Sequence, residues 1–174
     1  MIARVRLFAT PSPLSAKTSA LGEPFIRVFA GLHPEEVAGL VLVDPTQEEL
    51  IEWDKARKSE PDPPSRNRPG DEIDSAPATF VQAKENPVPN IPVFLISGQG
   101  PRAIPSFVSE KMRLEVEENQ NEFFPVKLAI YEEWLRQFPK SRLIVTERSG
   151  HGIPFEEPEL VVETIRQIIA ETTH

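Results

Sequence analysis

The stretch Gly39-Leu-Val-Leu-Val-Asp-Pro45 decides the fold class. Its central residues are all apolar, and a glycine and an Asp-Pro pair bound the run. A strand without polar alternation is typical of a parallel sheet that is covered on both faces. Two later stretches repeat the pattern, Ile91-Pro-Val-Phe-Leu-Ile-Ser-Gly98 and Arg142-Leu-Ile-Val-Thr-Glu147. Three such strands predict an α/β fold.

Helical patterns lie between and after these runs. Residues 158–171 predict the clearest helix, and residues 106–138 predict a longer one that Pro125 breaks or kinks. Residues 24–33 are apolar almost all round, so a buried helix and a strand both fit them. The predicted architecture is a parallel sheet flanked by helices. The expected buried stripes are Leu160, Val161, Thr164, Ile165, Ile168 and Ile169 in one helix, and Val126, Leu128, Ile130, Trp134, Leu135 and Phe138 in the other.

A proline-rich excursion separates the first two strands. Residues 47–58 look helical and acidic, whereas residues 59–79 predict irregular chain. The whole segment, at about 46–90, is a candidate for a small lid over one edge of the sheet. The prolines of its irregular part are Pro61, Pro63, Pro64, Pro69 and Pro77.

The first 22 residues have a different character from the rest. The stretch Pro11–Ala20 is rich in Ser, Ala and Pro, and it shows no hydrophobic period. Residues 1–22 are therefore expected to form an irregular leader, and residues 23–174 a single α/β domain.

Composition excludes several classes of protein and site. The 174-residue chain has a net charge of −8, which argues against binding to nucleic acid or to an anionic membrane surface. It contains no cysteine, so disulfides, thiolate metal sites and a cysteine nucleophile are excluded. His33, His151 and His174 are too scattered to predict a metal cluster. No apolar signal-peptide stretch opens the sequence, so a cytoplasmic location is expected.

The motif Ser149-Gly-His-Gly152 is the best candidate for chemistry. It directly follows the third predicted strand, and the carboxyl ends of parallel strands form the active edge of an α/β sheet. Histidine titrates near neutral pH and suits general-base work, and the flanking glycines allow a sharp turn and close approach of another group. The alternative is a histidine that only caps its loop.

The order of these elements resembles the α/β-hydrolase family. Phe29–Pro45 is similar to the helix-to-strand passage that follows the family's nucleophile, and Ile91–Gly98 to its next strand. Phe138–Ile169 is similar to the last strand, the catalytic-histidine loop and the closing helix. The resemblance covers about residues 22–171. It implies hydrolysis of a small carboxylic ester or related acyl substrate by a Ser–acid–His triad, without a cofactor, with His151 as the base.

The serine of that triad has no clear counterpart. The family carries it in Gly-x-Ser-x-Gly, and this chain contains no such motif. The corresponding window is Thr18–Glu23, where Gly22 matches the second glycine and Ala20 takes the nucleophile position. Ser19, one residue early, is the candidate nucleophile, and the alternative is a polar residue in the leader.

The acid has one candidate, Asp44. Many family members place the acid after the strand that corresponds to residues 92–97, but Gly98–Ala103 contains no carboxylate. Other members use the end of the preceding strand, which is Asp44 here. The alternative is that Asp44-Pro45 forms a turn and caps the next helix.

The resemblance covers only the C-terminal part of the family's fold, because residues 1–22 are too few for a βαβ unit. The chain is therefore expected to be a truncated hydrolase with an incomplete triad. Its strand at 40–44 would then have an unpaired edge and promote self-association. The alternatives are a non-catalytic remnant that binds a ligand or partner, and a fragment with no function of its own.

Overall fold

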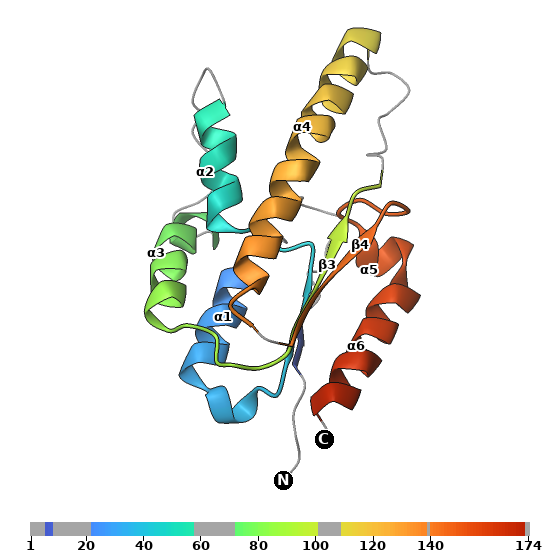
Figure 1. Cartoon of the computed structure of the whole chain (residues 1–174). Coiled ribbons are helices and arrows are strands. Elements are labelled where there is room, and N and C mark those ends of the chain that lie inside the picture. Colours follow the sequence, from blue (N-terminus) through green and yellow to red (C-terminus); the bar gives the residue numbers. More distant parts are fainter. Residues whose placement is uncertain (1–5, 9–21, 58–71, 101–108, 139, 173–174) are drawn as a thin grey trace.

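The computed structural model describes residues 6–8, 22–57, 72–100, 109–138 and 140–172 (Figure 1). They form a four-stranded sheet in the order β1-β2-β3-β4, in which every neighbouring pair is parallel. The predicted α/β class, a parallel sheet flanked by helices, is therefore confirmed. The strands are β1 (Arg6–Phe8), β2 (Leu40–Val43), β3 (Val93–Gly98) and β4 (Ser141–Thr146).

Helices cover both faces of this sheet. In Figure 1, α6 (red) lies on one side of the strands, and α1 (blue), α3 (green) and α4 (yellow to orange) lie on the other. A short 3-10 turn, η2, precedes β2, and α2 follows it. The helices are α1 (Gly22–Leu32), η2 (Pro34–Glu36), α2 (Glu48–Arg57), α3 (Glu72–Glu85), α4 (Glu110–Leu135), α5 (Ile153–Glu156) and α6 (Pro158–Thr172).

The unbroken apolar runs supply both halves of the core. Successive side chains of a strand point to opposite faces, so an all-apolar strand serves two layers. Leu40 and Leu42 of β2 face a cluster with α1 and α4, whereas Val41 and Val43 face α5 and α6. The same alternation holds for Val93–Ile96 in β3, where each residue is 0% exposed.

The amino-terminal segment corrects one prediction. Residues 6–8 were expected to belong to an irregular leader, but they form β1 and pair with Leu40–Leu42 of β2. The edge of β2, which was expected to be unpaired, is therefore covered. Three residues are too few to show a hydrophobic period, so the pairing with β2, and not a local pattern, determines this strand.

Helix α3 corrects a second prediction. Residues 59–79 were expected to be irregular, yet α3 begins at Glu72 and contains Pro77. Proline lacks the N–H that would bond to the carbonyl of Ile73, so the helix loses one bond near its start. Helix α3 packs against α1, and just past its end the chain comes so close that a Cβ on Gly31 would lie 2.2 Å from the carbonyl oxygen of Asn86. Residues 58–71 of the predicted lid lie outside the described part of the chain.

Helix α4 runs through Pro125 without a break. Trp134 and Leu135 of this helix, and Phe138 just after it, are buried as predicted, whereas the buried Tyr131 was not part of the predicted stripe. In α6, Val161, Thr164 and Ile168 are buried as predicted, but Ile169 is 43% exposed. Among the helices described, none has both the length and the apolarity needed to cross a membrane.

Candidate functional site

Asp44 lies where β2 ends, at the carboxyl edge of the sheet. Its φ is 46°, and no other non-glycine residue in the described ranges has a positive φ. Asp tolerates this left-handed conformation better than most side chains. The turn is fixed from α4, because the Tyr131 hydroxyl donates a hydrogen bond to the carbonyl of Pro45. The carboxylate of Asp44 is buried.

His151 lies in the loop that follows β4. Its Nδ1 is 2.9 Å from Oδ2 of Asp44, and its side chain is 44% exposed. A carboxylate accepts hydrogen bonds only, so an ionised Asp44 places the imidazole proton on Nδ1. Nε2 is then the nitrogen that can take up a proton from another group. The structure thus joins the two predicted residues, which are 107 positions apart.

The other oxygen of Asp44 has two further partners. Nζ of Lys127 donates to Oδ1 at 2.8 Å, and the backbone N–H of Gly98 donates to it at 3.1 Å. Burial would raise the pKa of Asp44, but the hydrogen bond with His151 and the charge of Lys127 outweigh it and hold the pKa below its usual value. The carboxylate is therefore ionised at neutral pH.

The histidine loop is attached to the start of α6 by Glu157, which is 7% exposed. Its Oε2 accepts hydrogen bonds from the hydroxyls of Ser149, at 2.6 Å, and Thr146. Arg148 Nε lies 3.4 Å from Oε1. The bonds from Ser149 and Thr146 hold the pKa of Glu157 below its ordinary value. The loop therefore starts from a fixed position two residues before His151.

Glycines allow the end of β3 to pack against this loop. A Cβ on Gly98 would lie 2.0 Å from the carbonyl oxygen of Gly150, and a Cβ on Gly100 would lie 2.6 Å from the carbonyl carbon of Ser149. The glycines beside His151 are less constrained. A Cβ on Gly150 would meet only the carbonyl oxygen of Gly100, at 3.6 Å. Gly152 has an ordinary φ of −83°, and a Cβ there would lie 2.8 Å from Oε1 of the Glu156 side chain, which is flexible. The close approach thus depends on the glycines of the neighbouring strand.

Comparison with solved structures finds similar chains that are esterases. An esterase from Thermogutta terrifontis, solved with malate bound, matches 87% of this chain and 62% of its own length, with 22% identity and a TM-score of 0.38. Carboxylesterase CesB (YbfK) from Bacillus subtilis matches 86% of this chain and 57% of its own, with 16% identity and a TM-score of 0.37. This chain thus spans about 60% of their lengths.

No protein-family model matches the chain, and no curated protein does.

The third predicted residue, Ser19, lies outside the described residues. The helix that follows it does start near the site. In the first turn of α1, Glu23 bonds to Arg27, and Arg27 Nη1 is 3.2 Å from Oε1 of Gln47, three positions after Asp44. The amino end of α1 is therefore at the same edge of the sheet as Asp44 and His151.

Lys127 and Glu157 were not among the predicted site residues. Lys127 had a signal, because it lies four residues before Tyr131 and seven before Trp134, on the apolar face of the helix. A lysine at such a position must pair with an anion or a carbonyl. The only sequence signal of Glu157 is its position at the start of a helix, where acidic residues are common.

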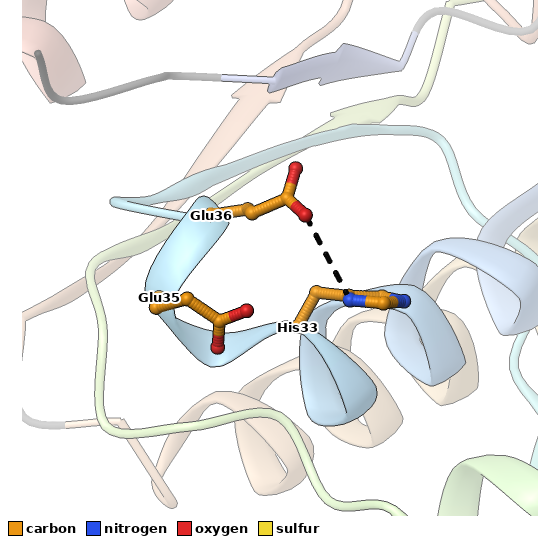
Figure 2. A group of neighbouring side chains, drawn as sticks. All are labelled: His33, Glu35 and Glu36. Atoms are coloured by element: carbon orange, nitrogen blue, oxygen red, sulfur yellow. Dashed lines mark ion pairs between the residues drawn. The ribbon is translucent and has the colours of Figure 1, made fainter.

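A second polar cluster lies at the opposite edge of the sheet. His33, Glu35 and Glu36 surround the η2 turn that precedes β2, and their ligand atoms all lie within 4.8 Å of one another (Figure 2). Nδ1 of His33 is 3.8 Å from Oε1 of Glu36. The spacing of the histidines alone does not predict this group, because its other two members are glutamates. Its side chains are solvent-accessible, and the His33–Glu36 pair suffices to explain it.

Proposed function

We propose that this chain carries the acid–histidine pair of a hydrolase that cleaves carboxylic esters or related acyl bonds. The observation that supports it is the contact of 2.9 Å between Oδ2 of Asp44 and Nδ1 of His151 at the carboxyl edge of a parallel sheet. The left-handed φ of Asp44 adds to it, because unusual backbone conformations cluster at functional sites. A turn that merely connected β2 to α2 would not need a buried carboxylate aimed at a histidine.

In the proposed reaction a serine Oγ attacks the acyl carbon while Nε2 of His151 takes its proton. Asp44 holds the imidazole by Nδ1 and stabilises the positive charge that forms on it. His151 then returns the proton to the leaving alcohol, and water releases the acid by the same route. Ser19 is the proposed nucleophile, since it lies three positions before Gly22, where the helix that begins at this edge starts.

The finer architecture belongs to the same proposal. We regard the domain as a partial α/β-hydrolase-type sheet, and the segment at about 46–90 as its small lid. Within this segment α2 packs on α4 through Trp53, whose ring centroid lies 5.9 Å from that of Phe123. Arg57 at the end of α2 also bonds to Glu122 of α4. The two helices would thus bound the approach to the site and select the acyl group.

The test is hydrolysis of p-nitrophenyl acetate and butyrate by the full chain. We expect Asp44→Asn to lower kcat/KM by about 10⁴-fold and His151→Ala by about 10⁶-fold, as the loss of the acid and of the histidine of a triad does. Ser19→Ala should cause a similar loss. His33→Ala is the matched control and should leave the rate unchanged, because His33 lies at the opposite edge of the sheet. Activity that survives His151→Ala would contradict the proposal.

A second candidate function is binding without catalysis. The absence of a Gly-x-Ser-x-Gly motif favours it, because the nucleophile then lacks the strained turn that exposes it. In that case the chain would hydrolyse no ester. Calorimetry would still detect binding of a carboxylate or an ester analogue. His151→Ala would leave the affinity for that ligand unchanged.

A further inference from the structure

Lys127 is a buried lysine whose ammonium group touches the acid of the pair. It belongs to α4, and the residue is 3% exposed. Its Nζ donates to Oδ1 of Asp44 and to the carbonyl oxygen of Gly98, both at 2.8 Å. Lysine is seldom buried unless its charge is paired, so this side chain is held here by a specific contact. The reaction described above gives it no role.

The two oxygens of Asp44 have different partners. Oδ1 accepts from Lys127 and from the N–H of Gly98, whereas Oδ2 faces His151. The terminal torsion of an aspartate is soft, so a carboxylate held only by the imidazole could rotate. Lys127 also bonds to Gly98, which belongs to the neighbouring strand, and so ties the carboxylate to the sheet. Two donors on one oxygen leave the other aimed at the histidine.

The surroundings of Lys127 strengthen this bond. Its Nζ lies 5.7 Å, 5.3 Å and 6.0 Å from the ring centroids of Phe123, Phe124 and Tyr131. These rings exclude water from one side of the ammonium group, and a low local dielectric makes its attraction to the carboxylate stronger. A buried carboxylate without such a partner would take up a proton or turn toward water.

We propose that Lys127 is the positioning residue of the Asp44–His151 pair. By binding Oδ1 it keeps the carboxylate ionised and aims Oδ2 at Nδ1, and so it fixes which nitrogen of His151 carries the proton. The importance of this for catalysis rests on the proposed function, but the placement of the proton does not. It can be measured whether or not the chain hydrolyses esters.

The experiment reads the imidazole tautomer of His151 by long-range ¹H–¹⁵N NMR of the full chain, labelled with ¹⁵N-histidine. The signal is assigned by its loss in His151→Ala. In the wild type at neutral pH the proton should reside on Nδ1. In Lys127→Met, Asp44 either becomes protonated and donates to Nδ1, or turns away, so the Nδ1–H preference should be lost. Lys55→Met, the same change at an exposed lysine of α2, should retain it.

The lack of native cysteine permits a rescue. Lys127→Cys, alkylated with 2-bromoethylamine in denaturant and refolded, regains an ammonium group on a side chain of nearly the same length. This adduct should restore the Nδ1–H tautomer, whereas alkylation with iodoacetamide should not. If both adducts fold and give the same tautomer, the ammonium group does not position Asp44 and the proposal is wrong.

Two further outcomes separate the hypotheses. A folded Lys127→Met chain that keeps the wild-type tautomer overturns the role of Lys127, even if the chain hydrolyses esters. A lost tautomer without any hydrolysis supports it and overturns only the proposed function. If Lys127→Met does not fold, the contact is tested in the wild-type protein. The measurement is the NMR scalar coupling across the hydrogen bond, from Nζ of Lys127 to Cγ of Asp44. Its presence supports the contact, and its absence overturns it.

Discussion

Glu23, in the first turn of α1, is held by the fold in an environment that disfavours its charge. It is 3% exposed, and although Oε1 pairs with Arg27 at 3.2 Å, Oε2 is buried without a hydrogen-bond partner. Burial therefore outweighs the attraction of Arg27 and raises the pKa of Glu23 to about 7. Near neutral pH this one residue gains or loses a proton beside the candidate site.

The sign of its effect on stability follows from linkage. The raised pKa means that between pH 4.5 and about 7 the folded chain binds more protons at Glu23 than the unfolded chain does. The free energy of unfolding should therefore fall as pH rises through this window, by up to ~3 kcal/mol from this group. Glu23→Gln should remove that part of the slope. Urea denaturation at pH 5, 6, 7 and 8 measures it.

The control for this series is Glu52→Gln, the same change at a side chain that is 65% exposed. The comparison is the difference between each variant and the wild type across the four pH values. If Glu23→Gln and the wild type lose stability in parallel from pH 5 to pH 8, Glu23 is not the titrating group.

At the level of single residues, the sequence predicted the Asp44–His151 pair but not what surrounds it. Both residues follow apolar strands, and that placement is visible in the chain. The partners of Asp44 are not visible in the same way, because Lys127 approaches from a helix 83 positions away. The backbone groups of Gly98 carry no signal in the sequence at all.

At the level of elements, the contact between the end of β3 and the histidine loop is a backbone-to-backbone fit. Gly98→Ala would place a methyl group 2.0 Å from the carbonyl oxygen of Gly150, and neither backbone can yield without moving His151. We expect a loss of about 1–3 kcal/mol in the free energy of unfolding, as for other overpacked sites. Ester hydrolysis should fall with it.

Gly150→Ala is the matched control, since its Cβ would make only an ordinary contact of 3.6 Å. Urea unfolding midpoints and the shift of the His151 ring signals measure both effects. If the two variants had the same unfolding midpoint and the same His151 ring signals, the backbones of β3 and the loop would not be in close contact at Gly98.

Whether a strand or helix could be predicted from the sequence depends on how its residues are buried. Strands β2, β3 and β4 were predicted because each is an apolar run, and α6 because its stripe has a helical period. Strand β1 is three residues long, and α3 contains a proline, so both are determined by contacts with distant residues. The buried face of α4 was partly misplaced because Lys127 interrupts its apolar pattern.

At the level of the whole molecule, β3 is the centre of the structure. Val93–Ile96 are 0% exposed and are bonded to strands on both sides. In contrast, Met112 and Leu114 near the start of α4 are 53% and 54% exposed. We expect the amides of β3 to exchange with deuterium about 100-fold more slowly than those of residues 112–119, because only global unfolding exposes them. Mass spectrometry of peptic fragments measures this, and equal rates would mean that the sheet is not the cooperative unit.

The order of the strands has a consequence for synthesis on the ribosome. Asp44 leaves the ribosome long before its partners, which lie 54, 83 and 107 positions downstream in Gly98, Lys127 and His151. At roughly 5–20 residues per second, the nascent chain carries this carboxylate unpaired for several seconds. Because the strands are ordered along the sheet as they are along the chain, each can add to the edge of the one before it. The Asp44–His151 pair is then completed only when the loop after β4 emerges, shortly before α6.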